Sequence, residues 1–370
     1  MTAVVLTVNA GSSSLRLHLI RDGRVLRVEH SEHSPDPAQA ERTITEFLGR
    51  TDDHEGGWVT VGVVGHRLVH GGDAVVAPTV VDDGVLRAVR GFADLAPLHV
   101  PPALALVDAA RRALPSVPHV LCPDTAFHAN LPVAAATYPL PAEWRRRYGL
   151  RRFGFHGLSY AHATRRAADL LGRPAGELHL VAAHLGGGSS VCAVREGRSV
   201  DTSMGFTPLE GVPMSKRSGS VDPGMLLWLL SDSRLSLDEL SDGLEHASGL
   251  LGLSDGLSGD TRELVASPEP AAALALEVFA HRVAREIAAA ATGLDRLDAL
   301  VFTGEIGWDQ PEVRDDVCRR LALLGLEPPV RGNLEADGFV SAPGARVPVV
   351  VVETREELQV AREALAAVNS

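Results

Sequence analysis

Two stretches decide the fold, and each joins a hydrophobic strand to a turn of glycine and serine. The first reads Val4-Val5-Leu6-Thr7-Val8-Asn9-Ala10-Gly11-Ser12-Ser13-Ser14. The second reads Leu180-Val181-Ala182-Ala183-His184-Leu185-Gly186-Gly187-Gly188-Ser189-Ser190. After the first turn, leucines alternate with Arg16 and His18, which is typical of a half-buried second strand. After the second turn, Val191 and Ala193 alternate with Cys192 and Val194, and this run reads as a second strand as well. Gly11 and Gly187 are 176 residues apart, close to half of the 370-residue chain, so the pattern predicts two domains related by duplication.

The remaining sequence alternates strand-like and helical segments, which indicates an α/β fold. Further strands are expected at residues 59–64, 117–121, 299–303 and 347–352. Helices are expected at residues 103–114, at residues 268–292 with Ser267 as N-cap and Gly293 at the C-terminal end, and from Thr354 onward. Residues 31–57 read as a loop-rich segment with one short helix. We place the domain boundary near residue 150, which gives domains 1–150 and 151–355, with a helix over 356–370 packing back on the first.

Composition limits the function classes. Apolar residues make up 45% of the chain and charged residues 22%, enough for packed cores, and a net charge of −12 argues against nucleic-acid binding. No apolar run approaches the roughly 18 residues that a membrane span needs, and the first residues lack a signal-peptide pattern, so we expect a cytoplasmic protein. The three cysteines, Cys122, Cys192 and Cys318, form no CxxC pair and are expected to be buried and structural.

The glycine-serine turns suit phosphate binding. Such a turn presents backbone N–H groups and hydroxyls without bulky side chains, which matches the needs of phosphate oxygens. Two copies, each directly after a hydrophobic strand, are stronger evidence than one. Neither copy fits a P-loop, and neither fits the dinucleotide fingerprint, because both lead into strands and not into helices.

Four charged or titratable residues stand in positions where ligands bind. Arg67 ends a strand-like run, Asp124 follows another, His156 lies between glycines, and Arg217 lies in the polar loop 214–223. An arginine at a strand end can bind a carboxylate or phosphate through two hydrogen bonds. Taken singly, each is more typical of a solvated loop or a surface ion pair.

Taken together and in order, the motifs resemble the acetate kinase family. They are Asn9–Leu15, Gly65–Arg67, Asp124–His128, Gly154–Gly157, Ser203–Gly211 and Thr354–Leu358. The resemblance spans nearly the whole chain. It implies two duplicated actin/hexokinase-like (ribonuclease H-like) domains flanking a nucleotide cleft, Mg²⁺, ATP or ADP as co-substrate, a short-chain carboxylate as acceptor, and a homodimer.

The resemblance also assigns roles on the acceptor side. Arg67 is expected to hold the carboxylate of acetate or of another short-chain acid. Asp124 is the expected active-site acid, and His156 and Arg217 are expected to stabilise the transferring phosphoryl group. The two residues expected to organise Mg²⁺ are Asn9 and Glu356. Three residues of the motif stretches are expected to wall a small apolar acyl pocket: Leu98, Phe155 and Pro208.

On the nucleotide side the resemblance implies a larger set of residues. Arg16 is expected to contact the nucleotide phosphates. The remaining residues expected to line the nucleotide site are His184, Leu185, Gly186, Gly187, Gly188, Asp260, Thr261, Arg262, Glu305, Ile306, Gly307, Trp308 and Asp309.

The chemistry makes physical sense of this set. A carboxylate must attack a polyanionic phosphate, so cations must converge locally, and the protein mainly positions the reactants and stabilises charge. A carboxylate is already ionised at pH 7 and needs no general base. We therefore expect Asp124 to act through Mg²⁺ and its waters, or by orienting an arginine or histidine, and not by abstracting a proton.

Four positions depart from the family pattern. Gly187 stands where asparagine is usual, Arg16 replaces a lysine, and Thr261 replaces an apolar or aromatic residue. The stretch Glu305–Asp309 replaces Gly-Ile-Gly-Glu-Asn, so that Glu305 takes a glycine position. The predicted function is reversible phosphoryl transfer between ATP and acetate, giving acetyl phosphate and ADP. The alternatives are a propionate or butyrate kinase, an acyl kinase that uses another nucleotide or pyrophosphate, and a weakly active binding or regulatory paralogue.

Overall fold

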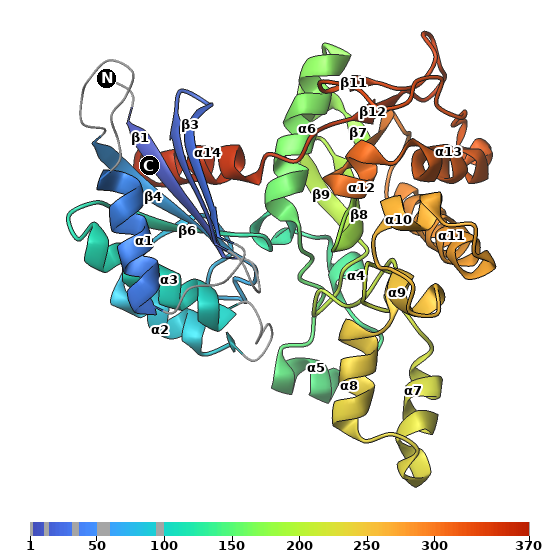
Figure 1. The fold of residues 1–370 in the computed structure, drawn as a ribbon, viewed down its shortest axis with the longest axis horizontal. Coiled ribbons are helices and arrows are strands. Elements are labelled where there is room, and N and C mark those ends of the chain that lie inside the picture. The colour runs from blue at the N-terminus through green and yellow to red at the C-terminus, as the bar shows by residue number, and fades with distance from the viewer. Residues whose placement is uncertain (1–2, 11–14, 32–36, 50–59, 94–99, 370) are drawn as a thin grey trace. The chain divides into compact units, whose positions relative to one another are not determined.

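The computed structural model describes residues 3–10, 15–31, 37–49, 60–93 and 100–369 (Figure 1). The chain divides into two compact units. The first comprises residues 1–129, 156–158 and 355–370, and the second comprises residues 130–155 and 159–354. The chain leaves the first unit at Ala129 and not near residue 150, because the stretch 130–155 packs within the second unit. There the backbone N–H of Phe153 donates to Gly205.

The first unit is built on a six-stranded mixed sheet with the order β3-β2-β1-β4-β6-β5. Its strands are β1 (Val4–Ala10), β2 (Leu15–Arg21), β3 (Arg24–Ser31), β4 (Val61–Leu68), β5 (Thr79–Val80) and β6 (His119–Pro123). Strands β1, β4 and β6 run parallel to one another, so their carboxyl ends lie at the same edge of the sheet.

Helices cover both faces of this sheet. One face packs against α1 (Pro37–Gly49), α2 (Asp83–Arg90) and α3 (Val100–Ala113), and the other packs against the C-terminal helix α14 (Glu356–Asn369), as Figure 1 shows. The strand period of two sorts the side chains: Leu6 joins the first core and Val5 the second. Gly65 lets α14 approach β4 closely, because a Cβ there would lie 2.7 Å from Val360 Cγ1.

The second unit contains a second six-stranded sheet, with the order β11-β12-β10-β7-β8-β9. Its strands are β7 (His179–Leu185), β8 (Ser189–Arg195), β9 (Arg198–Thr202), β10 (Ala299–Thr303), β11 (Gly338–Phe339) and β12 (Val349–Val351). Matching β7 to β1 and continuing in chain order reproduces the strand order of the first sheet, with the same parallel and antiparallel pairings. The predicted duplication and the α/β class are confirmed.

The helices of the second unit are mostly short. They are α4 (Val133–Ala136), α5 (Ala142–Tyr148), α6 (Gly157–Leu171), α7 (Pro223–Leu230), α8 (Leu237–His246), α9 (Gly249–Leu253), α10 (Thr261–Ala266), α11 (Pro270–Ala291), α12 (Gly304–Asp309) and α13 (Pro311–Arg320). The first two residues of α6 are counted with the first unit. The long helix α11 supplies much of the core, with Phe279, Val283 and Ile287 facing the sheet.

The predicted start of α11 is wrong by two residues. Its N-cap is Glu269, and Pro270 takes the first-turn position, while Ser267 serves as the C-cap of α10. The sequence offers a proline at both 268 and 270, and α10 occupies the chain up to Ala266, so the later proline opens the helix. At the other end the C-cap is Thr292, one residue before the predicted Gly293.

Some expectations fall outside the described residues. These are the first glycine-serine turn (residues 11–14), Leu98, and most of the loop-rich segment around α1 (residues 32–36 and 50–57). All three cysteines are buried and free of disulfides, as predicted. Among the helices described, none combines the length and apolar character that crossing a membrane requires.

Candidate active site

The first unit gathers four of the predicted residues at the carboxyl edge of its sheet. Asn9 lies near the end of β1, Arg67 near the end of β4, and Asp124 directly after β6. Glu356 is the first residue of α14. Parallel neighbouring strands bring their carboxyl ends together, and this is where open α/β sheets bind ligands.

The guanidinium of Arg67 is the centre of this group, which we call the Arg67 cluster (Asn9, Arg67, Asp124 and Glu356). It binds the Asp124 carboxylate through two nitrogens: Nη2 lies 2.8 Å from Oδ2, and Nε lies 3.2 Å from Oδ2 and 3.3 Å from Oδ1. Its Nη1 lies 3.1 Å from Glu356 Oε2 and 3.4 Å from Asn9 Oδ1. Two carboxylates and an amide oxygen thus hold this one cation, and together they fix the orientation of the planar guanidinium group.

Burial makes these charges interdependent. The Asp124 side chain is 1% exposed, and Arg67 and Glu356 are 18% and 14% exposed. Burial raises the pKa of Asp124 above its usual range and Glu356 adds to the rise, while Arg67 opposes it. Burial acts to lower the pKa of Arg67, but Asp124 and Glu356 outweigh it, so that pKa is raised and the guanidinium stays charged.

The backbone around His156 is fitted against Asp124. The N–H of Gly157 donates to the Asp124 carbonyl at 3.0 Å, and a Cβ at residue 157 would lie 2.1 Å from that oxygen. The backbone of His156 has a φ of 57°, a left-handed conformation that residues other than glycine rarely adopt. Glycine at 157 is therefore required for the backbone next to His156 to pack so closely against Asp124.

The donor set fits the predicted magnesium. Asn9 and Glu356 offer the amide and carboxylate oxygens that Mg²⁺ prefers, and both reach the same nitrogen of Arg67. No group of three or more His, Cys, Asp or Glu among the described residues is arranged as a metal cage. Mg²⁺ usually binds through one or two carboxylates together with waters and substrate phosphates, so such a cage is not needed. Arg16, expected to contact phosphates, is exposed and pairs across the strands with Asn9.

The second unit contains the second glycine-serine turn. Residues 186–188 join β7 to β8, and Ser189 closes the turn: its hydroxyl accepts from the Gly186 N–H at 3.2 Å and donates to the Gly186 carbonyl at 3.1 Å. Ser215 N–H donates to the Gly187 carbonyl, which ties the polar loop 214–223 to the same turn. We call residues 186–188 the phosphate loop.

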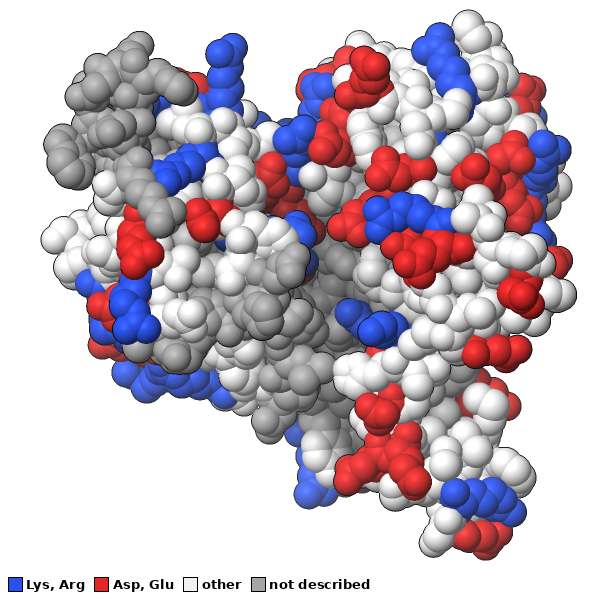
Figure 2. Space-filling view, viewed as in Figure 1, with Lys and Arg blue, Asp and Glu red and all other residues white. Residues whose placement is uncertain are grey.

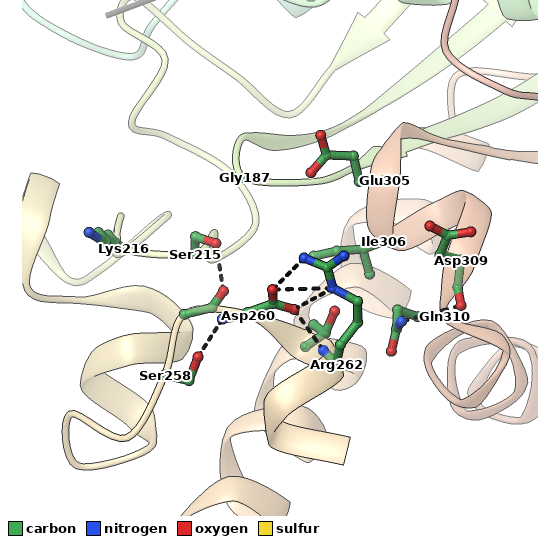
Figure 3. A pocket seen from close by; sticks show the side chains of 12 residues that line it. Gly187, Ser215, Lys216, Ser258, Asp260, Arg262, Glu305, Ile306, Asp309 and Gln310 are labelled. Atoms are coloured by element: carbon green, nitrogen blue, oxygen red, sulfur yellow. Dashed lines mark hydrogen bonds and ion pairs between the residues drawn. The ribbon is translucent and has the colours of Figure 1, made fainter. Parts of the chain in front are cut away.

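Beside the phosphate loop lies a cavity of about 530 Å³, which we call the nucleotide cavity (Figure 3). Seven predicted residues line it: Gly187, Asp260, Thr261, Arg262, Glu305, Ile306 and Asp309. Six others do not: His184, Leu185, Gly186, Gly188, Gly307 and Trp308. Trp308 packs instead against the hydrophobic core of the unit, because α12 turns that face inward.

Five further residues line the cavity that the sequence had not assigned to it: Ser215, Lys216, Ser258, Gly259 and Gln310. Lys216 is the only lysine of the chain. Ser215 and Lys216 belong to the polar loop that drew attention through Arg217, so a signal existed for them. Ser258 and Gln310 flank predicted motifs by two residues or fewer, and only the packing of α10 and α12 shows that they face the cavity.

The charges of the nucleotide cavity are exposed and partly cancel. Arg262 binds Asp260 through Nη2 at 2.6 Å and Nε at 3.0 Å, and this bonding lowers the pKa of Asp260. Figure 3 shows Glu305 projecting from the start of α12, apart from the Asp260–Arg262 pair, with Asp309 near the end of that helix. Acidic and basic side chains are likewise mixed over the face drawn in Figure 2.

Arg217 is bonded to a backbone carbonyl of its own unit. Its Nη1 donates to the Pro208 carbonyl at 2.9 Å, and Gly249 packs directly on the loop, because a Cβ there would lie 2.7 Å from the Arg217 carbonyl oxygen. Burial lowers the pKa of Arg217, with Glu245 opposing. Arg217 belongs to the second unit and Arg67, Asp124 and His156 to the first. Phe155 is buried and Pro208 half-buried, both in the second unit.

Comparison with known proteins agrees with this arrangement. A sequence profile of the acetokinase family matches residues 25–362. An acetate kinase from Deinococcus radiodurans is 43% identical over 97% of this chain and 96% of its own. One from Leifsonia xyli is 42% identical over 99% of both chains.

Solved structures agree as well. The acetate kinase of Porphyromonas gingivalis superimposes with a TM-score of 0.88 at 31% identity, over 99% of this chain and 100% of that one. A propionate kinase from Francisella tularensis superimposes with a TM-score of 0.89 at 31% identity, over 98% and 99%. The similarity thus extends over nearly the full length of this chain in both sequence and fold. The chain belongs to the acetokinase family, whose members are phosphotransferases with a carboxyl group as acceptor.

Proposed function

We propose that this protein transfers a phosphoryl group reversibly between ATP and acetate, forming acetyl phosphate and ADP. The observation that carries the proposal is the Arg67 cluster. A half-buried guanidinium, oriented by the buried Asp124 and flanked by oxygens of the kind that bind magnesium, suits the binding of a small carboxylate next to a phosphate. The family relationship supports the same reaction.

In this mechanism the acetate carboxylate binds Arg67 and attacks the terminal phosphorus without losing a proton. Asp124 serves as a positioning residue, because both its oxygens are engaged with Arg67. Asp124 thereby keeps Arg67 charged and holds its guanidinium in a fixed orientation. His156 and Arg217 donate to the oxygens of the transferring group, where negative charge spreads as the bond to ADP breaks.

Asn9 and Glu356 are the residues that would hold Mg²⁺. When bound, the ion neutralises polyphosphate charge. The protein's own contribution there is to bring two oxygen ligands, one from Asn9 and one from Glu356, together beside the same nitrogen of Arg67.

The nucleotide cavity is proposed as the site of the nucleoside. Its volume of about 530 Å³ lies within the range of small-molecule pockets. The Glu305 carboxylate in its wall favours a second candidate, a kinase with another preferred donor. Turnover with ATP, GTP and pyrophosphate, measured side by side, separates the two: saturation by ATP at ordinary concentrations removes the second candidate.

A homodimer is proposed on the basis of an exposed apolar surface. Helix α7 has no buried residue although it is almost wholly apolar, and Leu227 and Trp228 are 71% and 57% exposed. Monomeric proteins rarely leave such a patch uncovered. Light scattering on Leu227→Glu should show a loss of dimer, whereas Leu323→Glu, at a 98% exposed leucine elsewhere in the unit, should leave the dimer intact.

The reaction is tested by trapping acyl phosphate with hydroxylamine. The purified protein is supplied with MgATP and with acetate, propionate or butyrate. Each added methylene changes burial by only about 0.8 kcal/mol, so activity with all three acids and a preference for one is expected. Binding of nucleotide without any acyl phosphate would favour a regulatory paralogue and refute the proposal.

A further inference from the structure

We propose that Ser159 is a positioning residue for His184, and that its hydroxyl fixes the imidazole in the tautomer that carries its proton on Nε2. His184 would then offer an N–H donor on the side of the phosphate loop. The inference rests on the proposed function, because it assigns that N–H to the phosphates of the donor.

The contact is short and buried. Ser159 is the third residue of α6 and is 1% exposed, and its Oγ lies 2.8 Å from His184 Nδ1. His184 is the last residue but one of β7, two positions before Gly186 of the phosphate loop, and is 9% exposed. A buried hydroxyl and a buried imidazole at this distance share one proton between them.

This hydrogen bond determines which of the two neutral tautomers His184 adopts. A neutral histidine carries its proton on one nitrogen and accepts at the other. When the Ser159 hydroxyl donates to Nδ1, the proton of His184 must lie on Nε2. Phosphate oxygens only accept hydrogen bonds, so the other tautomer would present a lone pair to a lone pair.

The geometry places Nε2 on the correct side. A Cβ built on Gly186, the first residue of the phosphate loop, would lie 3.9 Å from His184 Nε2. The nitrogen that Ser159 leaves protonated therefore borders the loop. The Ser159 hydroxyl does not contact the phosphates itself; it affects their binding by setting which nitrogen of the His184 ring carries the proton.

The next residue of the same helix supplies a matched control. The Tyr160 hydroxyl lies 2.5 Å from Ser190 Oγ on β8, and it also bonds the backbone of His184. Tyr160 is fully buried, like Ser159. Its hydroxyl thus stabilises the same hairpin without touching the imidazole.

The tautomer can be read directly from long-range ¹H–¹⁵N spectra of the full chain labelled at histidine, with His184 assigned by its loss in His184→Ala. The Nε2–H form is expected in the wild type and in Tyr160→Phe, and a mixture of tautomers is expected in Ser159→Ala. An Nδ1–H form in the wild type, or a Ser159→Ala spectrum with the tautomer unchanged, would overturn the inference. So would an equal shift in Tyr160→Phe.

A double-mutant cycle tests the consequence for catalysis. Ser159→Ala is expected to lower kcat/KM for ATP about tenfold in the wild type, as loss of a ligand-orienting partner does at metal sites. It should change kcat/KM less than about twofold in His184→Ala. Equal losses in both backgrounds would show a structural role and refute the inference. A wild type without activity would instead refute the proposed function, while the spectra would still decide the tautomer.

Discussion

The two units share one strand topology but hold their functional groups in different ways. In the first unit Asp124 is buried, the other members of the Arg67 cluster are half-buried, and each charge is bonded to another of the cluster. In the second unit the nucleotide cavity is lined by exposed side chains, such as Lys216, Glu305 and Asp309, and its firmest bond joins two of its own residues, Asp260 and Arg262.

Under the proposed function, the contrast follows from what each ligand needs. A small carboxylate offers few contacts, so the protein must fix its cation in advance and keep water away. A nucleotide offers many contacts, so no single side chain has to be held so firmly. Changes in the Arg67 cluster are therefore expected to affect both fold and rate, whereas changes in the nucleotide cavity are expected to affect donor binding alone.

The largest effect is expected for Arg67→Gln. It removes the acyl-binding cation and leaves Asp124 buried without its partner, so kcat/KM for acetate should fall at least about 10²- to 10³-fold, and stability should fall by about 3 kcal/mol. Acyl phosphate assays and urea denaturation measure the two losses. Adding Asp124→Asn should restore much of the stability and none of the rate. A stable, active Arg67→Gln protein would contradict the contrast between the units.

Gly157→Ala should come next. The new Cβ would lie 2.1 Å from the Asp124 carbonyl, so the His156 backbone must move away from the active-site acid. We expect a loss of about 10- to 100-fold in kcat, because misplacement by about an ångström carries such a cost. Gly176→Ala is the control, since nothing lies within 4 Å of its Cβ position. Equal kcat values in the two variants would show that the close contact between Gly157 and the Asp124 carbonyl does not matter for catalysis.

Glu305→Gly should have a smaller effect, confined to the donor. Removing an exposed carboxylate from the wall of the nucleotide cavity should lower the KM for ATP about three- to tenfold and leave kcat and stability almost unchanged. Steady-state kinetics at saturating acetate measure it. A large fall in thermal stability would show that the charged residues of the nucleotide cavity support the fold as strongly as those of the Arg67 cluster.

The smallest effect concerns pH and the buried histidines of the first unit. His66 Nε2 lies 3.0 Å from His119 Nδ1, and burial lowers the pKa of both rings. Below pH 6.5 these histidines bind protons in the unfolded chain but stay neutral in the folded chain. The free energy of unfolding therefore falls as the pH falls, by at most about 1.4 kcal/mol per pH unit for each proton. His66→Gln should flatten this slope in denaturation series from pH 7 to 5. His281→Gln, at an exposed position of the second unit, should not.

The sequence predicts those parts of the fold that depend on local pattern. The hydrophobic runs and glycine-serine turns located β1, β7 and β10 and the duplication of the sheets. The unit boundary was placed too late, because nothing local distinguishes residues 130–155 from the preceding segment, and only their packing on the second unit does. The start of α11 was misplaced because Pro268 and Pro270 fit a first turn equally well.

The site divides in the same way. The four members of the Arg67 cluster were each named as candidate site residues from the sequence, since they belong to motifs that end strands or begin a helix, but the contacts among them were not predicted. The wall of the nucleotide cavity was predicted only in part. Trp308 was expected there and packs in the core, whereas Ser258 and Gln310 were missed, because the rotation of α10 and α12 about their axes depends on tertiary packing.

The central proposal is that Arg67, His156 and Arg217 all act on the transferring phosphoryl group. A crystal structure with MgADP, acetate and aluminium fluoride tests it most directly. The account predicts Arg67, His156 and Arg217 all within hydrogen-bonding distance of acetate or of the fluoride plane, with Asn9 and Glu356 beside the metal. Arg217 facing away from that plane in the complex would contradict it.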